Sequence, residues 1–519
     1  MQEKGEGPAG GQEKVAEGIG SRGGAAAVTK LSVGEKIGYG FGDGAANFVF
    51  QTMLIFQLPF YTNVFGISAA AAGTLLLVGR FWDAVFDPFM GTLADRTNTR
   101  WGKFRPWVLW SAVPFAVAFV LVFTTPHLGA TGKMVYAYIM YILLMTLYSV
   151  NNTPYSALNG VITGDVNERT SLSSYRFFFS MTAALIVQGF TLPMVYKFGQ
   201  GDSQKGYTMT IGMFAIVMII FYIITFFSVR ERVKPDPKQK SSPKKDLVGL
   251  LKTRPWVAMF VTTLFVFVTL AMWGSGMFYY FTYYIDKDAL YNFLQSLGLS
   301  QSASGTGGVW YGILNGFGLI VGKDGSNVSG VGFSLFNMAG MLMNILGLMV
   351  SPALARRFGK KLVFGTGLFF TALFTGLFIL LPAQAVGAAF ILNILKSAAY
   401  GPTIPLLWAM MADVADYSEW RTRRRATGLV FAGISFALKA GLGFGGAICG
   451  WILSAYGYNN LPNAVQTPHA ILGIRMASSI FPALTFFAGF TAILFYAISK
   501  KLSLQIQDEL AERRKSFEY

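Results

Sequence analysis

The stretch Gly79-Arg80-Phe81-Trp82-Asp83-Ala84-Val85-Phe86-Asp87-Pro88 places three charged residues inside an apolar segment that runs from about residue 70 to 93. Arg80, Asp83 and Asp87 are spaced i, i+3 and i+7, so they share one face of a helix. A charged side chain at the centre of a membrane helix costs about 2.5–3.5 kcal/mol on insertion scales, and such residues are usually functional. The stretch therefore predicts a membrane helix whose charged face lines a cavity or pairs internally.

The composition around this stretch is that of a membrane protein. Of 519 residues, 53% are hydrophobic and 13% are charged, whereas a soluble protein is about 25% charged. The apolar residues gather in blocks of about 20, the length that crosses a bilayer as a helix. A soluble enzyme is therefore excluded. One cysteine, Cys449, and two histidines leave no disulfide framework and little material for a metal site.

The apolar blocks predict an all-α integral membrane fold with twelve transmembrane helices in two halves of six. The expected spans are 37–62, 70–93, 106–126, 134–160, 171–196, 207–229, 256–284, 331–354, 362–382, 385–412, 427–456 and 470–499. The expected organisation is a disordered cytoplasmic tail (1–33), an N-terminal half (34–229), a basic cytoplasmic linker (230–254), a C-terminal half (255–500) and a second cytoplasmic tail (501–519). A long external loop at 286–330 carries a short apolar piece, 309–321, which we expect to be amphipathic or re-entrant rather than a thirteenth span.

The net charge of +17 is an orientation signal. Of the 42 Lys and Arg residues, 32 fall in alternate loops and in the two tails, and five fall in the intervening loops. Cytoplasmic loops of membrane proteins carry this excess of basic residues. The pattern predicts a multi-pass protein of the plasma (bacterial inner) membrane with both termini in the cytoplasm, and it argues against nucleic acid as a partner.

The two halves carry matching spacings, which predicts an internal repeat. The second set recurs 251 residues after the first: Pro154, Asp165 and Glu168, then Pro405, Asp416 and Glu419. Many secondary transporters are built from such repeats, with the binding site between them near the middle of the membrane. In the second repeat Gly347 and Ser351 stand where Asp83 and Asp87 would, so the carboxylates belong to the N-terminal half alone.

Two interpretations of the carboxylate pair remain open. The functional one is a site for a small cation or a proton, because hard cations prefer oxygen ligands and two acids beside one base leave about one negative charge. The alternative is a charge-paired strut. On the fourth span, Ser149 and Asn152 share a face and add neutral oxygens near this site.

The first span suggests a site for a polyhydroxylated solute. Tyr39, Asp43 and Asn47 are spaced four apart on a glycine-rich helix, although such a stripe can equally make polar contacts between helices. Arg176 opens the fifth span. Lys439 is expected to be the only cation in the middle of a C-terminal-half span, where it contacts substrate or pairs with a carboxylate across the interface.

Charged residues at the cytoplasmic ends of the spans are candidates for gates that break and re-form during transport. This group consists of Asp95, Arg96, Asp165, Asp413 and Asp416, with Arg80 added from within the second span. The alternative interpretation is that helix-end charges are simply solvated.

Five stretches together resemble a known family. They are Asp-Gly-Ala-Ala-Asn (43–47), Arg-Phe-Trp-Asp-Ala-Val-Phe-Asp-Pro (80–88), Arg-Trp-Gly-Lys-Phe-Arg-Pro-Trp (100–107), Asn-Asn-Thr-Pro-Tyr-Ser-Ala-Leu (151–158) and Asp-Val-Ala-Asp-Tyr (413–417). They are similar to the glycoside–pentoside–hexuronide:cation symporters of the major facilitator superfamily, over residues 33 to 500. The resemblance implies a twelve-helix fold and sugar uptake coupled to Na⁺ or H⁺.

The resemblance also implies roles for individual residues. Asp83, Asp87 and Ser149 match the family's cation site, and Arg176 and Lys439 match its fifth-helix arginine and eleventh-helix lysine. The chain departs from the melibiose permease branch by having Asn47, Asn152 and Ser156 where that branch has two Asp residues and a Trp, and by having Asp43 as an additional acid. The pattern is closer to xyloside and glucuronide carriers, so melibiose itself is not the expected substrate.

The leading hypothesis is secondary symport by alternating access. The cation is expected at Asp83 and Asp87 with Ser149 and Asn152, and the glycoside at Tyr39, Asp43, Asn47, Asn152, Arg176 and Lys439. The alternative is a lipid or lysolipid carrier of the same fold. An enzyme is not expected, because the spans hold no nucleophile–base pair or metal cluster. No cofactor is expected besides the coupling ion, and we expect a monomer in the lipid bilayer.

Overall fold

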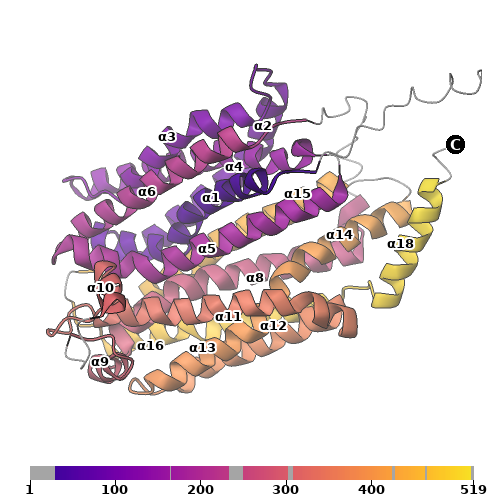
Figure 1. Cartoon of the computed structure of the whole chain (residues 1–519). Coiled ribbons are helices and arrows are strands. Elements are labelled where there is room, and N and C mark those ends of the chain that lie inside the picture. Colours follow the sequence, from indigo (N-terminus) through magenta and orange to yellow (C-terminus); the bar gives the residue numbers. More distant parts are fainter. Residues whose placement is uncertain are drawn as a thin grey trace, which may run out of the picture.

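The computed structural model describes residues 30–163, 165–232, 249–301, 308–422, 427–461 and 464–515. The described chain forms a bundle of long, roughly parallel and antiparallel helices (Figure 1). Most of the predicted N-terminal tail and of the predicted linker lies outside the described residues. The bundle has two ends, which we name by what lies there. The start of α1 and the last helix, α18, lie at the terminal end, and α9 and α10 lie at the opposite, loop end.

Six long helices make up the N-terminal half. They are α1 (Val33–Pro59, continued by the π-helical η1, Phe60–Phe65), α2 (Ala69–Arg96), α3 (Arg105–Val122), α4 (Ala130–Ile162), α5 (Val166–Gly199) and α6 (Ser203–Ser228). Side chains cap the N-termini of three of these helices. Ser32 accepts a hydrogen bond from the Glu35 backbone N–H at the start of α1, Ser68 accepts one from Ala71 at the start of α2, and Asp165 accepts one from Glu168 at the start of α5.

The C-terminal half is more interrupted. It consists of α8 (Arg254–Tyr279, continued by η2, Tyr280–Tyr284), α11 (Val328–Phe358), α12 (Lys360–Leu377, with η3, Phe378–Leu380), α13 (Val386–Tyr400), α14 (Thr403–Thr422), α15 (Thr427–Ala455), α16 (Pro468–Ser478) and α17 (Ile480–Leu494). Within the described ranges, 11 helical segments are long and apolar enough to cross a membrane, with α16 and α17 together forming one of them. The pair α13 and α14 supplies the twelfth crossing, so the twelve-helix prediction is confirmed.

The predicted span 385–412 is a single helix in the sequence pattern but two helices in the structure. The break falls at Gly401-Pro402, because Pro402 has no backbone N–H to donate to a carbonyl oxygen one turn earlier. Gly401 also needs to lack a side chain, since a Cβ there would lie 2.8 Å from the carbonyl oxygen of Asn344 on α11. Ser351, the counterpart of Asp87, donates a hydrogen bond of 2.7 Å to the Pro402 carbonyl. In the second repeat, the position that corresponds to Asp87 therefore stabilises the break between α13 and α14.

The long loop 286–330 contains two short helices, α9 (Lys287–Ser296) and α10 (Val309–Gly316). With eight residues, α10 is too short to cross a bilayer, which agrees with the expected short segment. It is followed by Phe317, whose ring centroid lies 5.0 Å from that of Phe190 on α5. Helix α18 (Lys500–Lys515), in the predicted C-terminal tail, runs across the terminal end of the bundle (Figure 1).

The two halves meet along three helix pairs: α2 with α15, α5 with α11, and α1 with α8. Glycines let α2 and α15 approach closely. A Cβ on Gly73 would lie 2.9 Å from the Ala447 carbonyl oxygen, and one on Gly443 would lie 3.0 Å from the Cβ of Arg80. Small residues at helix crossings are typical of membrane bundles.

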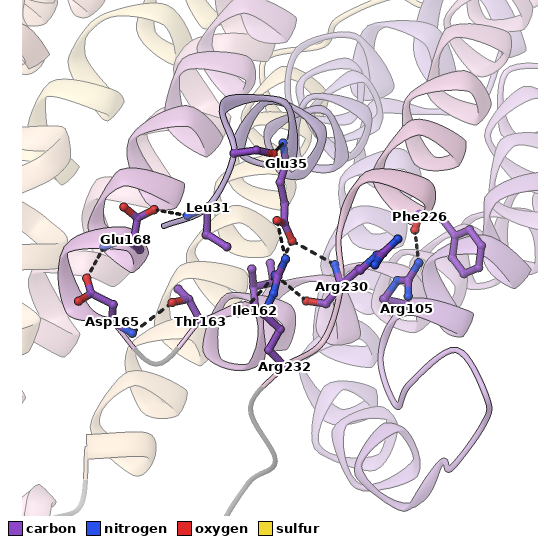
Figure 2. A network of polar contacts seen from close by, with 11 residues as sticks. Leu31, Glu35, Arg105, Ile162, Thr163, Asp165, Glu168, Phe226, Arg230 and Arg232 are labelled. Atoms are coloured by element: carbon purple, nitrogen blue, oxygen red, sulfur yellow. Dashed lines mark hydrogen bonds and ion pairs between the residues drawn. The ribbon is translucent and has the colours of Figure 1, made fainter. Parts of the chain in front are cut away.

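A polar network holds the terminal end of the N-terminal half together (Figure 2). The carboxylate of Glu35 is buried and accepts two hydrogen bonds from Arg232, at 2.6 and 2.9 Å, and one from the Arg230 backbone N–H. These hydrogen bonds raise the pKa of Arg232 above its ordinary value, so its guanidinium stays charged. Next to it, Glu231 accepts hydrogen bonds from the backbone N–H groups of residues 103 to 105. The segment after α6 is thereby fastened to α1 and to the start of α3.

Candidate functional site

A polar cavity of about 510 Å³ lies between the two halves. Helices α1, α2, α4 and α5 form one wall, and α8, α14 and α15 form the other. Among the predicted site residues, those on its wall are Asp43, Asn47, Arg80, Asp83, Asp87, Asn152, Arg176 and Lys439. Residues predicted from five separate spans therefore converge on one space at the interface of the repeats.

The acid pair of α2 meets Lys439 of α15. The Lys439 ammonium nitrogen lies 2.8 Å from Asp83 Oδ2 and 2.5 Å from Asp87 Oδ2. Asp83 is fully buried, whereas the Asp87 side chain is 30% exposed. One ammonium does not balance two carboxylates by itself, and Arg80, on the same cavity wall, forms no ion pair with either acid among the described residues. Lys439 therefore pairs with carboxylates across the interface, which is the second of its two predicted roles. Lys439 also lies on the wall of the cavity.

Hydroxyl groups of α4 complete the carboxylate site. Ser149 donates a 2.5 Å hydrogen bond to Asp83 Oδ1, and Thr153 donates a 3.2 Å hydrogen bond to Asp87 Oδ1. Ser149 was predicted at this position and Thr153 was missed, although it lies one turn further along the same face. Asn152 lines the cavity beside them. Carboxylate and hydroxyl oxygens are suitable ligands for a hard cation, and the carboxylates can equally hold a proton.

The second polar group of the cavity is built around Asp43 of α1. Its Oδ1 accepts a 2.9 Å hydrogen bond from Nε of Arg176, and the two side chains form an ion pair. Asn47 Nδ2 donates to the Asp43 backbone carbonyl at 2.9 Å. The Arg176 guanidinium also lies over the ring of Tyr155, 5.5 Å from its centroid. Asp43, Asn47 and Arg176 thus present donors and acceptors to the cavity, whereas the Tyr155 ring is fully buried and does not line it.

Tyr39 does not line the cavity, which corrects its predicted role in direct substrate contact. It is fully buried and stacks on Tyr155 with ring centroids 4.9 Å apart. The reason is helix geometry. Four residues turn a helix by about 40° beyond a full turn, so Tyr39 lies about 80° around α1 from Asn47. Tyr39 supports Tyr155, and Tyr155 in turn supports Arg176.

Arg80 lies at the central cavity rather than at a helix end, so the structure places it apart from the other predicted gate residues. It is 5% exposed, and its guanidinium lies 5.7 Å from the ring centroid of Phe50. Sequence spacing made it the expected partner of the two acids, but Lys439 from the opposite half takes that place.

The other predicted gate residues lie at the terminal end. Asp95 and Arg96 are exposed at the end of α2. Asp165 caps α5. Asp413 is held by Lys360 at 2.7 and 2.8 Å within the C-terminal half. Asp416 lies half-buried on α14, about one turn from Asp413. The contacts described for Asp165 and Asp413 are within a half, so their part in gating stays a prediction.

The loop end of the bundle is joined across the halves. Thr62 Oγ1 lies 2.7 Å from the Tyr279 hydroxyl, Asn63 donates to Tyr283 at 3.0 Å, and the Tyr458 hydroxyl donates to Asn63 at 2.6 Å. The cavity lining extends the other way, toward the terminal end, through Ser156, Ser173 and Ser435. These serines were not predicted as site residues, because serine in a span has no distinctive sequence signal. The geometry describes a carrier closed at its loop end.

A two-fold repeat of six helices around a polar central cavity is the architecture of a secondary transporter of the major facilitator superfamily. One solved structure, from work titled for substrate recognition in proton-dependent oligopeptide transporters, superposes with a TM-score of 0.59 over 92% of this chain and 99% of that chain. Its sequence is only 9% identical, so this likeness concerns the fold alone.

The sequence profile of the MFS/sugar transport proteins matches residues 38–311 and 306–500, and the chain belongs to that family. A candidate glycoside/cation symporter of Escherichia coli (strain K12), YagG, is 34% identical over 94% of this chain and 96% of its own length. The isoprimeverose transporter of Lactiplantibacillus pentosus is 32% identical over 90% of this chain and 89% of its own length. The family resemblance found in the sequence is confirmed.

Proposed function

We propose that this protein carries a glycoside across the membrane together with a cation, by alternating access. The observation that carries the proposal is the acid pair of one half, buried at Asp83 and partly exposed at Asp87, which a lysine of the other half bridges on the wall of the central cavity. The relatives that are named for glycoside and isoprimeverose transport support the same function.

The coupling follows from the charge of the site. Lys439 alone does not balance both carboxylates, and an unbalanced carboxylate becomes more costly when the halves close around it and water leaves. A cation that binds at Asp83 and Asp87 removes this cost. Lys439 belongs to the opposite half, so its contact with the acids is free to change as the halves move. It is therefore not a fixed partner that would neutralise the pair permanently.

The glycoside is proposed to bind beside the cation, at Asp43, Asn47, Asn152 and Arg176. The shared cavity supports this assignment, because the Asp43–Arg176 ion pair and the acid pair of α2 both lie on its wall. Charged and amide groups on the wall suit sugar hydroxyls better than an acyl chain, and they favour a sugar over the lysolipid alternative. Coupling of about 1–3 kcal/mol between the two ligands would be typical of such a carrier.

We also infer the orientation of the protein from its charges. The basic segments 94–105 and 355–361 lie at the terminal end of the bundle, so this end faces the cytoplasm under the positive-inside rule. The cavity then faces inward in this structure, and the joined loop end faces outward.

The function is tested by uptake into proteoliposomes of a panel of labelled glycosides, with the Na⁺ gradient and the pH gradient imposed separately. We expect at least one xyloside or glucuronide to accumulate under one of the two gradients and to equilibrate without it. If no glycoside accumulates under either gradient, while lysolipid is transported, the proposal is wrong. The same assay identifies the coupling ion.

A further inference from the structure

A second cation lies deep in the C-terminal half, against the expectation that Lys439 is the only one. Lys396 is ten residues from the start of α13 at Val386. At about 1.5 Å per residue this is about 15 Å, half the thickness of the hydrocarbon core. The predicted span 385–412 contains Lys396 and starts within one residue of α13, so the expectation that Lys439 is the only mid-span cation of this half was wrong. A charge at this depth calls for a partner or a function.

Lys396 has no fixed anionic partner among the described residues. Its ammonium nitrogen lies 3.9 Å from the centroid of the Trp273 ring, a cation–π contact. No Asp or Glu occurs in the segments 255–285, 325–412 and 427–507, which contain every helix packed around it in the C-terminal half. The buried acids of the N-terminal half, Asp43 and Asp83, are already paired with other cations.

Lys396 lines a cavity of about 100 Å³ that is separate from the central one. Three polar atoms on its wall lack a described partner: two donors, the Asn337 Nδ2 amide and the Ser397 hydroxyl, and one acceptor, Asn344 Oδ1. Ser397 is only 1% exposed. An ammonium, an amide and a hydroxyl gathered around a small space without an acid are the groups that bind an anion. A water molecule takes about 30 Å³, so the cavity has room for a chloride ion or a carboxylate.

This cavity also touches the N-terminal half and continues the path of the central one. Leu54 of α1 and Leu270 of α8 form part of its wall, and Phe50 and Phe267, about one turn earlier on the same helices, line the central cavity. One turn is about 5 Å along a helix axis. Gln188 of α5 completes the wall from the opposite half.

We propose that the Lys396 cavity binds one small monovalent anion, chloride or a carboxylate. The anion comes either from solution or from the transported solute, whose end reaches past Phe50 and Phe267. Bound there, it neutralises Lys396, accepts hydrogen bonds from Asn337 and Ser397, and ties α11 to α13 beside the α1 and α5 helices of the other half. An anion supplied by the transported solute rests on the proposed transport of a glycoside, whereas an anion taken from solution does not.

The test is the thermal stability of the purified full-length protein at constant Na⁺ concentration and ionic strength. The bulky Hepes anion is replaced by chloride or acetate, or methyl β-glucuronide is added with methyl β-glucoside as its neutral counterpart. We expect a saturable rise in Tm of several degrees with chloride or acetate if the source is solution, and with the glucuronide alone if the source is the solute. Lys396→Gln should remove this rise, and Lys396→Arg should keep most of it.

Two further variants make the result decisive. Lys133→Gln is the matched control, because Lys133 also lies over an aromatic ring, that of Phe65, but outside this cavity; it should respond like the wild type. Ser397→Ala keeps the lysine and should weaken anion binding severalfold, which covers the case in which Lys396→Gln does not fold. A wild type that responds to none of the three anions, or an unchanged response in both Ser397→Ala and Lys396→Gln, would overturn the inference. Gradient-driven uptake is a separate readout, so its failure would concern the proposed function alone.

Discussion

At the scale of single residues, the oxygen atoms around Asp83 are the proposed ligands of the coupling cation. The Ser149 hydroxyl donates to Asp83 Oδ1 at 2.5 Å, on the side of the carboxylate opposite to Lys439. A hydrogen bond to a charged group contributes about 1.5–3 kcal/mol. This hydroxyl can act in two ways. Its oxygen can ligate Na⁺, and its proton stabilises the ionised carboxylate of Asp83.

Ser149→Ala should therefore distinguish the two coupling ions by the direction of its effect. If the ion is Na⁺, losing a ligand should raise the half-saturating Na⁺ concentration about tenfold or more. If the ion is H⁺, losing a donor to the carboxylate should favour protonation, and the pH midpoint of uptake should move upward. Initial uptake rates measured against Na⁺ concentration and against pH check this. Ser174→Ala, an exposed serine on α5, is the control; an unchanged midpoint in both titrations of Ser149→Ala would show that the hydroxyl is no part of the site.

At the scale of helices, the contact between α2 and α15 brings the acids to Lys439. Gly73, Gly443 and Gly450 lie at this crossing, and a Cβ on Gly73 would lie 3.0 Å from the Ala447 Cα. The backbone of Ala447 cannot move aside as the end of a flexible side chain can. We therefore expect this close crossing of α2 and α15 to belong to the conformation described here. A carrier that rocks its halves must change such contacts.

We expect Gly73→Ala to lower the Tm by several degrees and to slow transport, although alanine is intrinsically the better helix former by about 1 kcal/mol. The added methyl group would push α15 away from α2 and lengthen the contacts of Lys439. The matched control is Gly212→Ala on α6, where nothing lies within 4 Å of the added Cβ. Its Tm should stay equal or rise. If Gly73→Ala behaves like Gly212→Ala in both measurements, the close crossing has no role.

A comparison of the predicted and observed helices shows which features of the fold and of the site the sequence was sufficient to predict. Apolar block length and basic-residue alternation predicted the twelve spans, because the bilayer imposes both. The break at Gly401-Pro402 was not predicted, since proline occurs inside α2 and α4 without ending them. Which residues of a polar stripe face the cavity depends on helix rotation, and rotation is set by packing between helices. For that reason Tyr39 was misplaced. Thr153 was missed although it shares the face of Ser149, and Lys396 was missed although it lies within a predicted span.

At the scale of the whole molecule, the two ends of the bundle differ. The loop end is joined by Thr62, Asn63, Tyr279, Tyr283 and Tyr458, which come from both halves. The cavity extends toward the terminal end. Under alternating access, this loop-end cluster must separate for substrate to enter from outside.

Cross-linking the loop end should therefore stop transport. Asn63 and Tyr458 are joined by a 2.6 Å hydrogen bond, so cysteines placed there, in a chain with Cys449 replaced by Ala, should react with a short bifunctional thiol reagent. Uptake should fall to background and return when a cleavable cross-linker is reduced. Cysteines at Lys36 and Glu168, an ion pair of 2.9 Å within one half, are the control and should leave uptake unchanged after cross-linking. Full uptake with the Asn63–Tyr458 link intact would contradict alternating access at this end.

The central claim concerns the whole carrier and depends on one carboxylate: the buried Asp83 on α2 holds the ion that drives transport. The most direct measurement compares two activities of Asp83→Asn in proteoliposomes, concentrative uptake under a cation gradient and exchange of labelled for unlabelled glycoside. Asp288→Asn, which changes an exposed acid on α9 that does not line the cavity, is the control. We predict that Asp83→Asn loses concentrative uptake but keeps part of the exchange, because the substrate residues around Asp43 remain. Undiminished concentrative uptake in Asp83→Asn would contradict the account.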